Sequence, residues 1–218
     1  MIKMKLKNSD SNLLGLIRDA HFWEYADIND NVKKSKAKKP KMFFTKSQLL
    51  LIIIAILCTS FTNGISADAA GYVISAMSLF TAMLIALVVS LFDKFGNTNF
   101  DKYKEVNNSD LYPFGIRLKN YFKKTIILTL YTAVLSILCI LLLTFLVLYK
   151  PMVLEIDLYA FISNINEYDN LFIVKAILLF LYRIILFYFL LNFIYITMQL
   201  ITSFYDYMVS EIQNVKLK

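Results

Sequence analysis

The chain has 218 residues, of which 58% are hydrophobic, and it still carries a formal net charge of +7. An average soluble domain is about 45–50% apolar, so the composition excludes an ordinary soluble globular fold. Five Gly and three Pro residues also exclude a collagen-like or low-complexity chain. The two cysteines, Cys58 and Cys139, lie in separate apolar blocks, so no disulfide framework is predicted.

The first 46 residues form a basic region that contains one predicted helix. Apolar side chains recur there at helical spacing and predict an amphipathic helix over residues 12–27. They are Leu13, Leu16, Ile17, Ala20 and Trp23. Two positions are open for this helix: on the membrane with Trp23 among the lipid headgroups, or packed on the loop at residues 93–124.

Four apolar blocks follow, and each is long enough to cross a hydrocarbon core of about 30 Å as a helix of about 20 residues. They occupy residues 43–62, 71–92, 125–149 and 173–201. None shows the strict alternation of a barrel strand. The expected fold class is therefore all-α, an integral membrane four-helix transmembrane bundle with an N-terminal cytoplasmic amphipathic helix.

Lys and Arg are concentrated in alternate connections. Residues 1–46 carry eleven and residues 93–124 carry seven, and positively charged loops remain in the cytoplasm. We therefore expect a multi-pass inner-membrane protein with both termini cytoplasmic, a transmembrane domain at 47–201, an external loop at 150–170 and a cytoplasmic tail at 202–218. Turn-forming residues predict two short helical pieces in the cytoplasmic loop: Phe95, Gly96, Asn97, Tyr112, Pro113, Phe114 and Gly115.

Small and hydroxylated side chains form one stripe on each of two spans. The second-span stripe consists of Ser75, Ser78, Ala82, Ala86 and Ser90. The third-span stripe consists of Thr125, Thr129, Thr132, Ser136 and Cys139. Such residues let membrane helices approach closely and bond to one another, so helix packing within the bundle is the first interpretation. A water-exposed pore lining is the alternative.

The fourth span carries a longer polar pattern, which we name the fourth-span seam. It consists of Tyr188, Asn192, Tyr195, Gln199, Thr202 and Asp206. The seam is a candidate oligomer contact or pore wall. Arg183 lies about 180° from Asn192 on a helix. It is either a functional charge near the middle of the bilayer, if the span starts at residue 171, or a snorkelling residue at the outer interface, if the span starts at 184.

Two basic clusters are candidate sites for lipid or ligand. They consist of Lys33, Lys34, Lys36, Lys38, Lys39 and Lys41 before the first span, and of Arg117, Lys119, Lys123 and Lys124 before the third. Anionic lipid is the first expected partner, and a nucleic acid, a nucleotide or an acidic protein is the alternative. His21 is the only histidine, and the sequence predicts no metal site, no cofactor and no enzymatic activity.

Three functions fit these features: an oligomeric pore, a non-conducting sensor or scaffold, and a transporter or immunity-type accessory protein. A transporter ranks last because it usually needs more spans and internal symmetry. The layout of four spans, a basic arm at 33–46 and a basic inner loop at 117–124 resembles the small membrane subunits of bacterial antiphage operons, such as the Hailong membrane effector and the Kiwa membrane subunit. That resemblance implies a homo-oligomer, most simply a tetramer, an ion channel as effector, and gating by a soluble operon partner or by nucleic acid.

Overall fold

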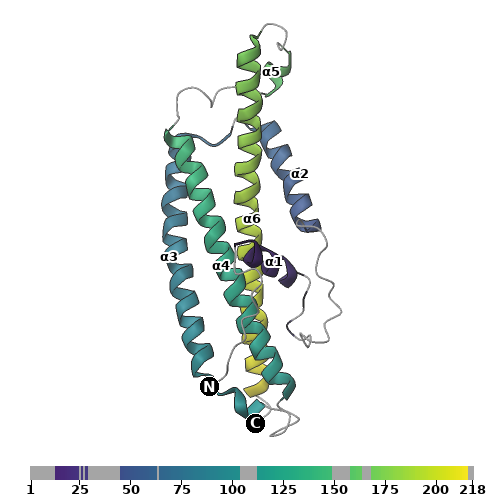
Figure 1. The fold of residues 1–218 in the computed structure, drawn as a ribbon, viewed down its shortest axis with the longest axis vertical. Coiled ribbons are helices and arrows are strands. Elements are labelled where there is room, and N and C mark those ends of the chain that lie inside the picture. Colours follow the sequence, from purple (N-terminus) through teal and green to yellow (C-terminus); the bar gives the residue numbers. More distant parts are fainter. Residues whose placement is uncertain are drawn as a thin grey trace. The chain divides into compact units, whose positions relative to one another are not determined.

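The computed structural model describes residues 13–24, 26, 28, 45–62, 64–103, 112–148, 158–163 and 168–215. Every regular element in these ranges is helical, which confirms the predicted all-helical fold. The elements, labelled in Figure 1 where there is room, are α1 (Leu13–Trp23), α2 (Lys46–Phe61), α3 (Ala67–Asn97), the 3-10 helix η1 (Phe100–Tyr103), α4 (Tyr112–Leu148), α5 (Leu158–Ser163) and α6 (Asn170–Val215).

Three helices, α3, α4 and α6, are long and apolar enough to cross a membrane. Their 31, 37 and 46 residues correspond to about 46, 55 and 69 Å of helix. Helix α2 has 16 residues, or about 24 Å, which is shorter than a hydrocarbon core of about 30 Å. Three of the four predicted spans therefore meet the length that a crossing needs, and the first does not.

A capping box explains why α2 is shorter than the predicted span at 43–62. The Gln48 amide N–H donates to Thr45 Oγ1, and the Thr45 N–H donates to Gln48 Oε1, each over 3.2 Å. This reciprocal pairing satisfies donors that a helix start leaves free, so α2 begins at Lys46. It ends at Phe61 because Thr62 is extended.

The cytoplasmic loop is not a single rod, as predicted, but its helical pieces are the end of α3, the short helix η1 and the start of α4. Helix α3 continues through Asn97, and α4 already begins at Tyr112. Pro113 is tolerated in the first turn of a helix because an N–H there has no intrahelical acceptor. Gly115 is buried against Tyr103, where a side chain would collide, so this glycine serves close packing and not a turn.

The chain divides into two compact units, and each is described by itself. The first unit comprises Met1–Phe44, Val88–Tyr131 and Gln199–Lys218. The second unit comprises Thr45–Leu87 and Thr132–Met198. Helices α3, α4 and α6 each contribute one part to both units.

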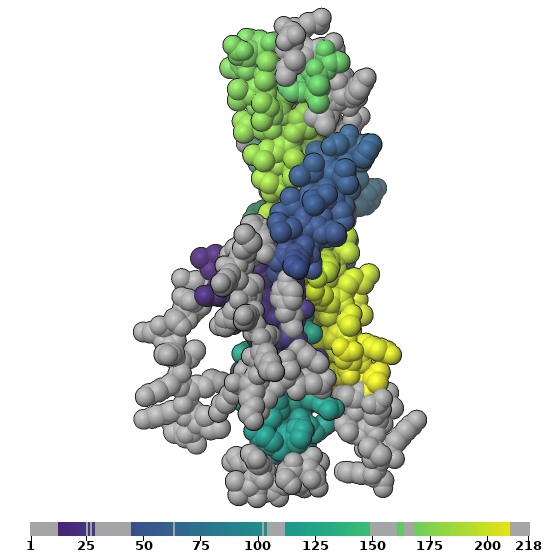
Figure 2. Space-filling model, turned by 90° about the vertical axis from the view of Figure 1, so that its right-hand side faces the viewer, coloured from purple at the N-terminus to yellow at the C-terminus, as the bar shows by residue number. Residues whose placement is uncertain are grey.

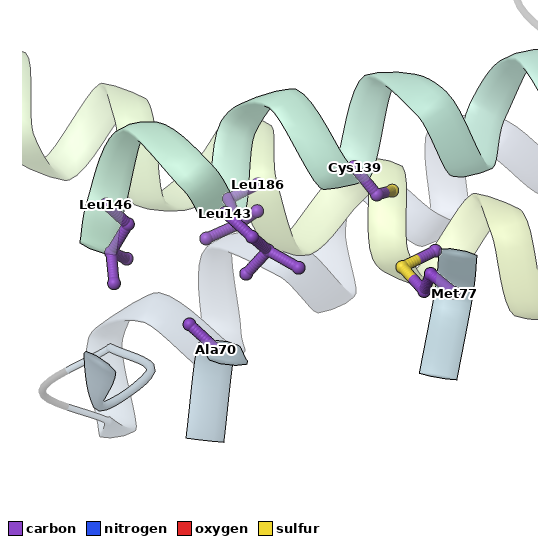
Figure 3. Packing of buried hydrophobic residues seen from close by; sticks show 6 residues of the cluster. All are labelled: Ala70, Met77, Cys139, Leu143, Leu146 and Leu186. Carbon is purple, nitrogen blue, oxygen red and sulfur yellow. The ribbon is translucent and has the colours of Figure 1, made fainter. Parts of the chain in front are cut away.

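The core of the second unit is formed by apolar side chains of α3, α4 and α6. Figure 3 shows its buried members, which are Ala70, Met77, Cys139, Leu143, Leu146 and Leu186. Ala70 and Met77 are seven residues apart on α3, and Leu84 continues the same buried face. A repeat of seven keeps one side of a helix toward its neighbours.

This buried face corrects the prediction for the second-span stripe. All five stripe residues are exposed in the single chain. The hydroxyls of Ser75 and Ser78 donate to carbonyls of their own helix, Gly71 O and Ile74 O. Larger apolar side chains fill the space beside α4 and α6 better than serine and alanine do, so the opposite face of α3 is the one that packs within the chain.

Helix α2 belongs to the second unit and packs within it by a narrow face. Its buried residues are Gln48, Leu51, Ala55 and Thr59. The rest of the helix, blue in Figure 2, presents a broad apolar surface, with Leu49, Leu50, Ile53, Ile56 and Leu57 exposed.

Candidate functional site

Helix α4 buries its hydroxyl groups. Thr125 and Thr129 are fully buried in the first unit, and Thr132 and Ser136 are fully buried in the second. Cys139, which continues the third-span stripe, is buried as well. This stripe is therefore turned toward protein along its whole length, unlike the stripe on α3.

In the second unit, hydroxyl groups connect α3 and α4. Ser136 Oγ on α4 donates to the Met77 carbonyl on α3 over 3.2 Å. Thr81 Oγ1 lies 2.7 Å from Ser136 Oγ and 2.7 Å from the same carbonyl. Interhelical hydrogen bonds of this kind hold membrane helices together where the hydrophobic effect does not. Thr81 was not singled out from the sequence, although it lies between Met77 and Leu84 on the buried face of α3.

In the first unit, aromatic side chains of α4 and α6 contact one another. The ring of Tyr121 stacks on that of Tyr207 with centroids 4.0 Å apart and planes 13° apart, and it meets Phe204 edge-on at 6.1 Å. Lys94 on α3 lies 5.6 Å from the centroid of Tyr207. Phe95 and Phe122 extend the aromatic contact to α3.

The register of α4 against α6 follows from the Tyr121–Tyr207 stack. The two helices run in opposite directions (Figure 1). About one turn along α4 and one turn back along α6 bring Thr125 to the level of Ser203, and a further turn brings Thr129 to the level of Gln199. Polar residues of both helices therefore share the same levels of the first unit.

Three oxygen atoms at these levels have no hydrogen-bond partner in the part of the chain that the structure describes. They are Thr125 Oγ1, Gln199 Oε1 and Ser203 Oγ, and all three are inaccessible to solvent. Ser203 as a whole is 0% exposed. Thr129 and Thr197, on the same two helices, donate to carbonyls one turn earlier instead. Ser203 was not singled out from the sequence, because it lies beyond the predicted end of the fourth span at residue 201.

The residues of the fourth-span seam differ in burial along α6. Asn192 is 1% exposed, and Tyr188, Tyr195 and Gln199 are half-buried. Thr202 and Asp206 are exposed. The seam as an oligomer contact or pore wall therefore stays a prediction, and its neighbours within one chain change along the helix.

Arg183 is buried in the second unit, with 2% of its surface exposed. Its guanidinium carbon lies 5.5 Å from the centroid of Phe180, at cation–π distance. Gly64, between α2 and α3, has a φ of +91°, and a Cβ there would lie 3.1 Å from Arg183 Nε. Arg183 therefore packs against the α2–α3 connection, where only glycine fits without strain.

Helix α1 packs against α4 in the first unit. Ala20, His21 and Trp23 are buried, and the His21 ring meets Tyr131 edge-on with centroids 5.7 Å apart. His21 Nε2 lies 3.4 Å from the Tyr131 hydroxyl. Beyond α1, Asn120 Nδ2 donates to the Ile28 carbonyl over 3.0 Å. This helix contacts α4 at Tyr131, which lies beyond the 93–124 loop on which it was predicted to pack, and Trp23 is 2% exposed.

The structure describes the basic cluster before the third span but not the cluster before the first span. Arg117, Lys119 and Lys123 are exposed on the first turns of α4, and Lys124 is half-buried. The six lysines predicted at Lys33, Lys34, Lys36, Lys38, Lys39 and Lys41 lie outside the described residues.

The described residues include no group of three or more metal-ligating side chains of the His, Cys, Asp and Glu types. Comparison with protein-family models, with curated proteins and with solved structures finds no match to this chain.

Proposed function

We propose that this protein is an oligomeric pore of the bacterial inner membrane that conducts ions and is gated from the cytoplasm. The observation that carries the proposal is the buried third-span stripe on α4, a helix long and apolar enough to cross a membrane. Polar side chains buried in membrane helices act as interhelical contacts or line aqueous paths. In the second unit Ser136 serves as a contact, whereas the levels of Thr125 and Thr129 hold unpaired oxygen atoms.

Helix α2 is proposed as the fourth membrane helix. Its exposed Leu and Ile side chains suit contact with lipid tails. Local thinning of the bilayer accommodates a helix of about 24 Å at modest cost. Arg183 then lies at the outer interface, beside the short external α2–α3 connection, as the second of its two predicted positions requires.

Cytoplasmic control is supported by the packing of α1. The basic segment at 33–46 follows α1 in the sequence and leads directly into α2. Because His21 contacts Tyr131 on α4, a ligand that moves this segment also acts on a membrane helix. An acidic partner, a nucleotide or a nucleic acid suits the charge of the segment.

The place in antiphage defence and the tetrameric state rest on the resemblance in layout alone. We expect expression with the neighbouring genes to reduce phage plaque counts and to depolarise infected cells. Cells that keep their membrane potential throughout infection would contradict an effector role.

The pore is tested by recording purified protein in planar bilayers. We expect single-channel currents, and we expect Asn192→Leu and Gln199→Leu to reduce them severalfold, because an apolar constriction dewets. Met198→Leu is the control, since Met198 is exposed on the same helix. Silent bilayers with every trigger, together with a stable complex with a soluble protein, would favour a scaffold.

The scaffold is the second candidate, and the exposed basic residues of α4 favour it. Replacing Lys119 and Lys123 with Gln removes two charges next to the predicted membrane surface, and each lysine near an anionic surface is worth about 1 kcal/mol. Lys175→Gln, exposed in the second unit near the start of α6, is the matched control. Loss of binding to anionic vesicles alone indicates a lipid site, and loss of oligonucleotide or protein binding indicates recruitment.

A further inference from the structure

The last turns of α6 carry apolar side chains on two faces. One face packs within the first unit, where Leu200 is buried and the rings of Phe204 and Tyr207 contact Tyr121. The other face, which we name the α6 heptad face, consists of Ile201, Tyr205 and Met208, and these side chains are 57%, 65% and 60% exposed. A helix that is apolar on two faces has more apolar surface than one set of neighbours covers.

Charged side chains at the same level show that this part of α6 lies outside the lipid tails. Asp206, between Tyr205 and Tyr207, is exposed. Lys94 on α3 lies 5.6 Å from the centroid of Tyr207, and both Lys94 and the adjacent Asp93 are exposed. An ionised side chain that faces hydrocarbon is costly, so these turns lie beyond the hydrocarbon core, as the predicted end of the fourth span at residue 201 requires. Exposed apolar side chains at this level mark a surface for a protein partner.

The spacing of the α6 heptad face indicates a partner helix with the same repeat. Tyr205 follows Ile201 by four residues, and Met208 follows Tyr205 by three. The sequence continues with Ile212 and Val215, four and three residues further, and α6 is helical to Val215. Alternate steps of three and four define the a and d positions of a coiled coil, whose side chains insert between those of the facing helix. By this count Tyr205 and Ile212 are a positions, and Ile201, Met208 and Val215 are d positions.

A second copy of α6 supplies such a helix in the required orientation. Copies of one membrane protein cross the bilayer in the same direction and are related by a symmetry axis, so their α6 helices leave the membrane parallel and at the same height. Equal positions of the α6 heptad face then meet, as in a parallel coiled coil. The charges in the sequence agree, because the same count gives Glu211 a g position and Lys216 the next e position, where opposite charges pair between helices.

From these observations we infer that the α6 heptad face joins copies of this chain in a parallel coiled coil on the cytoplasmic side of the membrane. The inference rests on the proposed function for its membrane orientation, and it deepens that function by naming a contact of the oligomer. The contact itself does not depend on ion conduction. Ile201, Tyr205 and Met208 are not members of the fourth-span seam, so the two predicted oligomer contacts can be tested separately.

Disulfide cross-linking tests the contact without measuring current. The full chain with Cys58→Ser and Cys139→Ala is purified, reconstituted in lipid vesicles without other proteins and oxidised with copper phenanthroline. We expect Met208→Cys to form a reducible dimer about tenfold faster than Asp206→Cys, because a disulfide forms only where two Cβ atoms come close, as they do at equal d positions of parallel helices. Asp206→Cys is the matched control, since Asp206 is exposed on the same turn but occupies a b position, away from the contact.

A second variant, Ile201→Cys at the preceding d position, carries the same expectation, in case Met208→Cys does not fold as judged by its elution in detergent. Dimer formation by the folded Met208→Cys or Ile201→Cys variant that is no faster than by Asp206→Cys would overturn the coiled coil, whether lipid or another part of the chain then covers the face. Fast cross-linking with silent bilayers keeps the contact and removes the pore, whereas currents without cross-linking keep the pore and remove the contact.

Discussion

The two units differ in the hydrogen-bond partners of their buried hydroxyl groups. In the second unit, Thr81 and Ser136 meet at 2.7 Å, and Ser136 bonds to a carbonyl of the other helix. In the first unit, Ser203 is equally buried but has no such partner. The neighbouring side chains differ as well, because short residues let two helices approach until hydroxyls meet in the second unit, whereas the rings of Tyr121 and Tyr207 stack between α4 and α6 in the first.

The largest effect is expected for the apolar core of the second unit. Leu143→Ala opens a cavity in the cluster of Figure 3 and should lower the free energy of unfolding by about 2–4 kcal/mol. Leu141→Ala is the control, since Leu141 is 61% exposed and Leu143 is 0% exposed on the same helix. Unfolding in mixed micelles measures both. Equal losses of unfolding free energy in the two variants would contradict the expectation that core packing stabilises the fold more than lipid contact does.

A smaller loss is expected where Arg183 meets the α2–α3 connection. Gly64→Ala places a Cβ 3.1 Å from Arg183 Nε on a backbone with positive φ and should cost about 1–3 kcal/mol. Gly71→Ala, in the open interior of α3, should instead stabilise by about 0.5–1 kcal/mol. Thermal melts of the two variants should shift in opposite directions, and a shift in the same direction would contradict the packing described for Gly64.

The smallest effect bears most directly on the comparison of the units. A double-mutant cycle of Thr81→Ala and Ser136→Ala should give a coupling of about 0.6 kcal/mol, the usual size for a hydrogen bond between membrane helices. The same cycle on Thr125 and Ser203 should give almost none, because no direct bond joins them. Equal couplings in the two cycles would remove the distinction between a paired and an unpaired contact.

Particular residues show which structural features the spacing of side chains in the sequence could predict. The third-span stripe was found from spacing alone, since hydroxyls every three to four residues in an apolar block are rare and visible. The second-span stripe had the same spacing and yet is exposed, because spacing defines a face but not the neighbour that covers it. Gly115 was interpreted as a turn because the contact that demands it comes from Tyr103, in another element.

The sequence by itself predicted that the chain is helical, that it has four apolar blocks of span length, three of which lie on helices long and apolar enough to cross a membrane, and where its basic residues gather. These properties follow from local hydrophobicity and charge, which each segment carries with it. Only the tertiary structure decided which face of α3 is buried, that α1 packs on α4, and that Ser203 lies covered without a partner among the described residues. Those properties depend on the shapes of side chains that are distant in the sequence, and shape complementarity leaves no local pattern.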